Sequence, residues 1–177
     1  LAQKGLPALG FDYTNFFALH YWKSDQFYPH QLVTHIFMHS MADFSHLLFN
    51  MFGLYMFGRV LESTMGEKKF LMFYLITGIG AALVQLISRE IQVQLLIADL
   101  SNEAIEYAKI NGAEIMRTNM GSARFLNDSN FVKYLLLTNS TMVGASGAIF
   151  GILMAFGYLF PNAQLQLLFP PIPIKGK

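Results

Sequence analysis

The chain has 177 residues and a net charge of +1; 54% of its residues are hydrophobic and only 13% are charged. Soluble domains carry about 25% charged residues, so this deficit, together with a mean hydropathy of +0.39, indicates a membrane protein. The small net charge gives no sign of a nucleic-acid surface, and the absence of cysteine excludes disulfides, thiolate catalysis and cysteine-based zinc sites.

The first half of the chain holds an aromatic loop followed by two apolar runs. Residues 1–43 are rich in histidine and aromatic side chains, and we expect an external loop with interfacial segments, in which Trp22 is well placed. Residues 44–61 predict a transmembrane span and residues 62–69 a cytoplasmic turn. Residues 70–88 contain no charge, and at about 1.5 Å per residue they nearly cross a hydrocarbon core of roughly 30 Å.

The second half holds an insertion, a third span and a proline-rich loop. Residues 89–133 are the least apolar part, and we expect an external insertion containing a helix with Ser101 as its N-cap and Gly112 at its C-terminus. Residues 134–160 predict the third transmembrane span, and residues 161–177 a cytoplasmic loop. The fold class expected is therefore an all-α, polytopic membrane protein, and a buried core helix is the alternative for each apolar run.

The orientation follows from the distribution of basic residues. The second span crosses the membrane back to the face from which the first span started. The first and third spans must therefore start on the same membrane face. Arg59, Lys68 and Lys69 lie near the first turn, and Lys175 and Lys177 follow the third span. The positive-inside rule makes these short loops cytoplasmic, so spans one and three start at the outer face. We expect a multi-pass protein of the bacterial inner membrane with its active site toward that face.

Three polar residues enter the membrane from this outer face. His46 and Asn50 are four residues apart, so they share one face of the first span, and Ser146 lies at the head of the third span. The three side chains should therefore lie at a similar depth. Polar residues inside a span are costly and indicate a functional site.

Small residues should let these helices approach closely. Gly147, Gly151 and Ala155 recur every four residues near the serine, as do Gly78 and Ala82 in the second span. Such small-xxx-small faces are typical of tightly packed membrane helices.

A serine beside an imidazole and a carboxamide suggests acyl-transfer chemistry. Attack of the Ser146 hydroxyl on an amide creates an oxyanion, and each donor aimed at that oxygen is worth roughly 3 kcal/mol. His46, Asn50 and the backbone N–H of Ser146 would be three such donors. A general base is also required. All five histidines precede residue 47, and only His46 is placed near the serine.

These residues carry a resemblance. The pattern His-x-x-x-Asn, followed two spans later by Gly-x-Ser-Gly in GASGAIFG, resembles the rhomboid family of intramembrane serine proteases. FGRVLESTMGEKKF is similar to that family's helix–turn–helix joint, with Glu62 and Gly66, and FPPIPIKGK to the loop after its nucleophile span. The resemblance covers most of residues 30–90 and 140–177.

The resemblance implies six core spans, of which this chain would hold the second, third and fourth. It implies Ser146 as nucleophile, His46 and Asn50 in the oxyanion hole, and Gly144 and Gly147 in the nucleophile loop. It also implies a base histidine in the sixth span. Since the chain opens on Leu1 and stops at Lys177, we expect a fragment that lacks the first and the last two spans and is inactive alone.

The resemblance further implies single-pass transmembrane proteins as substrates and a lipid bilayer as surroundings, with no cofactor, metal or nucleic acid; the oligomeric state stays open. Many members carry Trp-Arg in the first external loop, where this chain has Gln31-Leu32-Val33, so the anchoring of that loop is in question. The long 89–133 insertion has an open role.

Several alternatives remain. Ser146 could be a packing residue, and His46 with Asn50 a structural contact between helices. His35 and His39 have the spacing of a zinc-binding pair, but Ile36 stands where a metalloprotease helix has glutamate, so packed, hydrogen-bonded loop histidines are favoured. The competing function is a rhomboid-like pseudoprotease that binds membrane clients without cleavage; a small transporter or channel subunit is less favoured, because no intramembrane charge supports it.

Overall fold

The computed structural model describes residues 13–39, 44–118, 124–166 and 173–175. Helices account for nearly all of the secondary structure, as an all-α fold requires, and a two-stranded antiparallel ribbon with Leu165 opposite Ile174 follows the last helix. In chain order the elements are α1 (Tyr13–Phe17), α2 (Gln31–Thr34), η1 (His35–Phe37), α3 (Phe44–Gly53), η2 (Leu54–Gly58), α4 (Arg59–Met65), α5 (Glu67–Ile97), α6 (Asn102–Arg117), α7 (Ser129–Asn139), α8 (Ser146–Leu159), β1 (Gln164–Gln166) and β2 (Pro173–Lys175).

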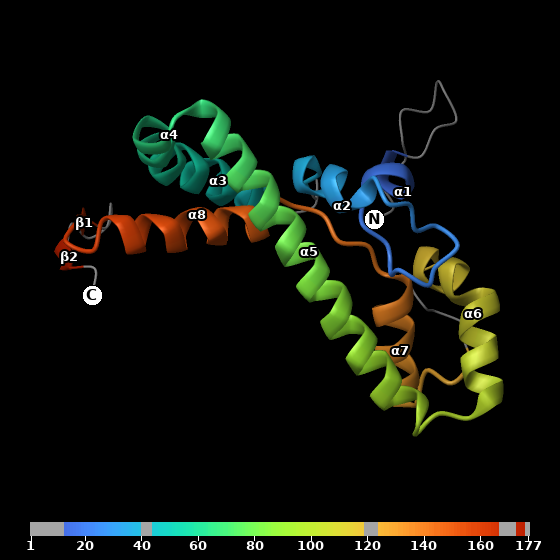
Figure 1. Ribbon diagram of the computed structural model, residues 1–177. Helices are drawn as coiled ribbons and strands as arrows, with labels where there is room; N and C mark the ends of the chain where they lie inside the picture. The colour runs from blue at the N-terminus through green and yellow to red at the C-terminus, as the bar shows by residue number, and fades with distance from the viewer. Residues whose placement is uncertain (1–12, 40–43, 119–123, 167–172, 176–177) are drawn as a thin grey trace.

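Helix α5 is the element on which the others are arranged (Figure 1). Helices α4 and α8 pack along its first half, and α7 packs along its second half. Its outward side is apolar over almost its full length, with exposed Leu71, Met72, Ile76, Leu83, Val84, Ile87, Ile91 and Leu95. An apolar side without a protein neighbour suits contact with lipid.

Among the described residues, α5 is the one helix long and apolar enough to cross a membrane. Helix α8 is apolar but has 14 residues, which is about 21 Å of helix and less than a typical hydrocarbon core. The polytopic arrangement expected from the sequence is therefore supported in part, by α5.

The run 44–61 and the turn 62–69 have different limits from those expected. Helical structure continues from Phe44 to Met65, with a π-helical turn at η2 in its middle. The turn before α5 is a single residue, Gly66, whose φ of +84° favours glycine. The Gly66 amide donates to the Glu62 carbonyl at 2.8 Å and so closes the last turn of α4.

The sequence had predicted one transmembrane span over residues 134–160, but these residues do not form one continuous helix. Helix α7 ends at Asn139 and α8 begins at Ser146, with non-helical residues 140–145 between them. Local apolar composition could not reveal this break, because the linker is held by residues far away in the sequence, as described below.

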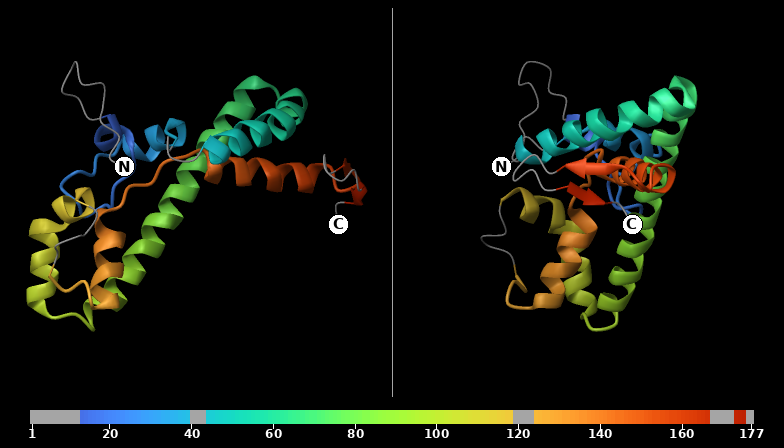
Figure 2. Two further views of the ribbon diagram at one scale, coloured as in Figure 1. Left: turned by 180° about the vertical axis from the view of Figure 1, so that it is seen from behind. Right: turned by 90° about the vertical axis from the view of Figure 1, so that its left-hand side faces the viewer.

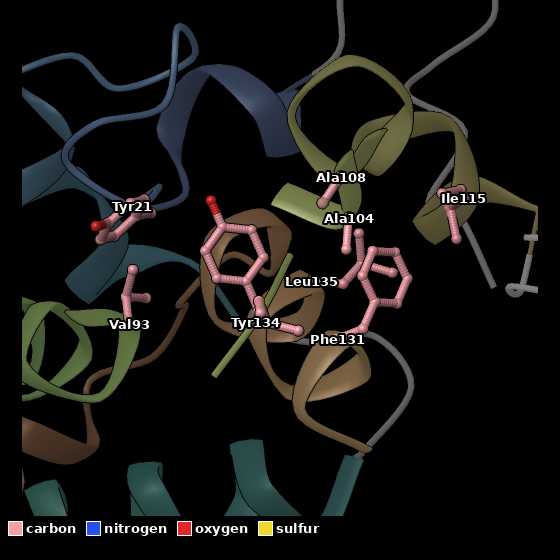
Figure 3. Close-up of a cluster of buried hydrophobic side chains, with 9 residues drawn as sticks. Tyr21, Val93, Ala104, Ala108, Ile115, Phe131, Tyr134 and Leu135 are labelled. Atoms are coloured by element: carbon pink, nitrogen blue, oxygen red, sulfur yellow. The ribbon is translucent and has the colours of Figure 1, made fainter. Parts of the chain in front are cut away.

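The sequence had assigned residues from 89 onward to an external insertion, but α5 continues to Ile97. Helices α6 and α7 form a hairpin against the end of α5, around a core of buried side chains shown in Figure 3: Tyr21, Val93, Leu100, Ala104, Ala108, Ile115, Phe131, Tyr134 and Leu135. Ser101 caps α6 as predicted, since its hydroxyl accepts from the Ala104 amide. Gly112 does not end that helix: it lies buried within it, where a Cβ would be 2.6 Å from the Asn139 side chain.

The contact between α5 and α8 depends on residues without large side chains. A Cβ on Gly147 would lie 2.5 Å from the Ala81 Cβ, and one on Gly151 would lie 2.6 Å from the Thr77 Cβ. These distances are far below van der Waals contact, so the glycine face predicted from the sequence is packed directly against α5. This contact determines where α8, and therefore Ser146, can lie.

We expect Gly147→Ala to lower the free energy of unfolding by about 1–3 kcal/mol, because the new methyl group overlaps Ala81. The measurement is denaturant unfolding in micelles. Gly157→Ala in the same helix is the matched control, since a Cβ there meets nothing within 4 Å, and its stability should be unchanged or slightly higher. Equal effects of the two substitutions would contradict the close-packing account.

Candidate active site

The segment 140–145, which leads into α8, is held at alternate residues by three partners. The Ser140 carbonyl accepts from Arg89 Nη1 at 2.9 Å. Met142 exchanges two backbone hydrogen bonds with Leu19, of 2.9 and 2.8 Å, and the Gly144 amide donates to the His35 carbonyl at 2.9 Å. Together these partners come from α5, the N-terminal segment and η1, so three separate parts of the chain position the residues before Ser146. Figure 2 shows this linker running between α7 and α8.

Gly144 lies close to both the serine and the imidazole. Its φ is +121°, a conformation that side chains other than glycine rarely adopt. A Cβ built on Gly144 would lie 3.5 Å from His46 Cε1 and 4.0 Å from Ser146 Oγ. Both side chains therefore border the same small space beside Gly144. The structure thus places the His46 ring and the Ser146 hydroxyl next to the same residue, although they are one hundred residues apart in the sequence.

Asn50 lies on the same face of α3 as His46, one turn further along. A Cβ on Gly53, three residues after Asn50, would lie 3.2 Å from Ile149 Cγ2 in the first turns of α8. Gly53 thus lies against the first turns of α8 and His46 lies beside Gly144, just before that helix, with Asn50 between them on the same face of α3. Its side chain is buried, and its Nδ2 has no hydrogen-bond partner among the described residues. A buried unsatisfied donor is costly and points to a functional role.

The N-terminus of α8 adds further donors. Its first internal hydrogen bond runs from the Ile149 amide to the Ala145 carbonyl, so the amides of Ser146 and Gly147 have no partner within the helix. Ala145 provides no capping side chain, whereas Ser101 and Asp128 cap α6 and α7. An uncapped helix N-terminus, with the positive end of its dipole, favours a negative charge beside it.

Gly147, which the resemblance places in the nucleophile loop, lies in the first turn of α8 and packs on Ala81. Gly144 lies in the loop itself. The two glycines therefore have different tasks: Gly144 adopts a conformation that other residues avoid, and Gly147 allows close helix packing.

Gln31 anchors the segment before α3, at the position where the resemblance would place the Trp-Arg of many rhomboid members. Gln31 is fully buried, and its side-chain amide donates to the carbonyls of Asn15, Phe16 and Gln26. Its Oε1 accepts from the backbone amides of His20 and Tyr28. Although this chain has Gln31 in place of Trp-Arg, the loop is still anchored. The donors and the acceptor of the Gln31 side-chain amide all have hydrogen-bond partners.

His35 connects this loop to the linker. Its Nδ1 lies 2.9 Å from the Gln31 carbonyl, and its own carbonyl accepts from Gly144. Burial lowers the pKa of His35 below its ordinary value of about 6.5, so the ring is neutral near pH 7. Nδ1 then carries the proton and donates to Gln31. The sequence favoured a packed, hydrogen-bonded loop histidine at this position over half of a zinc-binding pair. The described residues contain no group of three or more potential ligands that could hold a metal.

Sequence analysis missed Arg89, Leu19 and Gln31 as supports of the site. Arg89 follows the uncharged run directly and was assigned to an external insertion, although it is buried against the linker. A lone charge at the end of an apolar run was the one available signal. Nothing local marks Leu19, because its partner Met142 is distant in the sequence.

A family model, the rhomboid domain, matches residues 25–93. The match agrees with the resemblance that the motifs carry, and the matched residues include His46, Asn50, Gly66 and most of α5. Ser146 lies outside the matched residues. No curated protein and no solved structure matches the chain.

The lowered pKa of His35 predicts an acid-sensitive fold. At pH values above about 6.5 the ring is neutral in both the folded and the unfolded chain. As the pH falls below 6.5, the unfolded chain takes up a proton more readily than the folded one, so stability should decrease. Unfolding midpoints measured from pH 7.5 to 5.5 should show this decrease, and His35→Gln should make the slope shallower.

A slope that is the same in the wild type and in His35→Gln would show that His35 does not contribute to the acid sensitivity.

Proposed function

We propose that this protein is an intramembrane serine endopeptidase of rhomboid type in which Ser146 is the nucleophile. The observation that supports it most is the shared position of His46 Cε1 and Ser146 Oγ, within 3.5 and 4.0 Å of one point beside Gly144. The rhomboid-domain match supports the family, which is generally one of serine proteases. The protein would be embedded in a lipid bilayer, as the exposed apolar side of α5 suggests.

In the proposed reaction, Ser146 Oγ attacks the carbonyl carbon of the scissile peptide while a base removes the hydroxyl proton. The resemblance implies that this base is a histidine of the sixth span in the full-length protein, in a Ser–His dyad without an acid. The base then donates the proton to the departing amine, which leaves an acyl-enzyme. Water, deprotonated by the same base, hydrolyses that ester and restores the serine.

The oxyanion formed in each step would be stabilised by His46, Asn50 and the Ser146 amide. Three observations suit them to this role: the Asn50 Nδ2 is buried without a partner, His46 lies beside Gly144, and the Ser146 amide belongs to an uncapped helix N-terminus. Preorganised donors of this kind require little reorganisation during the reaction, and each is typically worth a factor of about 10²–10³ in kcat.

The substrate class that suits this site is a single-pass transmembrane protein whose helix unwinds near Ser146. A site built at the head of α8 and next to an apolar helix would be reached from within the bilayer, and hydrolysis would need a hydrated cavity beside the serine. We propose a multi-pass location, in the bacterial inner membrane, with the active site toward the outer face. The alternative is a pseudoprotease, which would bind the same clients without cleaving them.

We expect Ser146→Ala in the full-length protein to abolish cleavage of a transmembrane substrate in proteoliposomes, with the unfolding midpoint unchanged. The wild type should also react with a fluorophosphonate probe, and the variant should not, because the probe requires the activated hydroxyl. Ser63→Ala, which removes an exposed hydroxyl on α4, is the control and should cleave and label normally.

Cleavage that persists in Ser146→Ala would exclude this nucleophile. A wild type that binds the substrate in a pull-down, but neither cleaves it nor reacts with the probe, would instead establish the pseudoprotease function.

We expect Asn50→Leu to lower kcat by about 10²-fold with little change in KM, because an oxyanion donor acts only in the transition state. The same substitution should leave stability unchanged or raise it, since it removes a buried donor that has no partner among the described residues. Kinetics and denaturant unfolding of the one variant measure both effects. A large loss of stability with normal kcat would show that Asn50 is a structural contact.

A further inference from the structure

Arg89 is a buried cation on α5 that the proposed chemistry does not use. Its exposed fraction is 8%, and its guanidinium donates from Nη1 to the Ser140 carbonyl at 2.9 Å and from Nη2 to the Ser140 hydroxyl at 3.3 Å. No carboxylate within the described ranges forms an ion pair with it. A buried guanidinium without a counter-ion costs several kcal/mol unless its surroundings compensate, so its position needs a reason.

The end of α7 provides that compensation. Ser140 is the C-cap of α7, and its amide and hydroxyl both return to the Leu136 carbonyl, at 3.0 and 2.6 Å. The last carbonyls of a helix carry a partial negative charge, which an arginine stabilises. Arg89 therefore caps α7 from α5, with both branches of its planar fork on one residue. Lysine cannot reproduce this two-point contact.

Arg89 also lies at one end of the segment that leads to Ser146. The segment is attached to α5 at two points: Ser140 contacts Arg89, and Gly147 packs on Ala81. Arg89 and Ala81 are eight residues apart, roughly 12 Å along the helix, whereas seven extended residues can reach about twice that distance. The linker is thus longer than this separation along α5 requires. Its hydrogen bonds at residues 140, 142 and 144 restrict it to one conformation.

We propose that Arg89 is a positioning residue that sets the register of residues 140–145 and thereby the place of the Ser146 hydroxyl beside His46. This inference rests on the proposed function for its catalytic consequence. The mechanism is geometric: side chains alternate along an extended segment, so a shift of one residue would exchange its two faces and move Gly144 away from the His35 carbonyl. Arg89 does not contact the substrate in this proposal.

The test compares Arg89→Met with Arg89→Lys in the full-length protein, reconstituted in proteoliposomes. Methionine removes every donor while keeping an unbranched side chain, and lysine keeps the charge but not the fork. For Arg89→Met we expect hydrogen–deuterium exchange at the Met142 and Gly144 amides to accelerate about tenfold or more, the scale of a lost charge-assisted hydrogen bond. We expect kcat and the fluorophosphonate rate to fall by a similar factor with KM unchanged, and lysine to restore part of each loss.

The control is Arg117→Met, which removes an exposed arginine paired with Glu114 on α6 and should change none of these quantities. Unchanged exchange at Met142 and Gly144 in Arg89→Met would overturn the inference, even if activity fell. Hydrogen–deuterium exchange that accelerates equally across α5 and α7 would also overturn the inference, because Arg89 would then act on general stability. If Arg89→Met does not fold, the exchange of Arg89→Lys is compared with that of the wild type instead. If Ser146→Ala retains cleavage the proposed function fails, and the exchange measurement still decides whether Arg89 sets the register.

Discussion

The arrangement of this molecule depends on the close approach of two helix backbones. Gly147 and Gly151 of α8 face Ala81 and Thr77 of α5 at distances that leave no room for a Cβ. Within a bilayer, helices do not gain the hydrophobic free energy that drives association in water, so packing of this kind supplies much of the attraction. Because Gly147 follows Ser146 directly, the same contact that joins the helices also determines the depth and orientation of the serine.

Around this contact, buried polar groups connect the loops to the helices. Gln31 satisfies the carbonyls of the N-terminal segment, His35 joins that segment to Gly144, and Arg89 joins α5 to the end of α7. Glu90 adds a fourth connection, since its carboxylate accepts from Tyr21 Oη at 2.6 Å and Trp22 Nε1 at 2.7 Å. Gln31, His35 and Arg89 are each costly to bury alone and favourable when paired, so the loops adopt one arrangement rather than several.

The candidate site contains a buried polar group that lacks a partner among the described residues. The Asn50 Nδ2 is buried without a partner among the described residues, Ala145 leaves the start of α8 uncapped, and Gly144 has a φ of +121°. All three features reduce stability locally, and all three lie within a few residues of His46 or Ser146. Donors and strain left in this way are typical of sites organised to bind a developing negative charge. The insertion helices α6 and α7 contrast with this, since both have satisfied N-caps.

The sequence by itself determined the local features. The uncharged run 70–88 predicted α5, the spacing of His46 and Asn50 placed them on one helix face, and Ser101 marked the start of α6, because each feature depends on neighbours within one or two turns. The motifs also indicated the rhomboid family, whose domain model matches residues 25–93.

Only the tertiary structure decided the break at 140–145, the packing role of Gly112 and the supports provided by Leu19, Gln31 and Arg89. The partners of Leu19 and Arg89 lie more than fifty residues away, and Asn139 is 27 residues from Gly112. Such contacts leave no periodic trace in the sequence, because hydrogen bonds and close packing between distant segments depend on how the helices are placed and not on the pattern of any one of them.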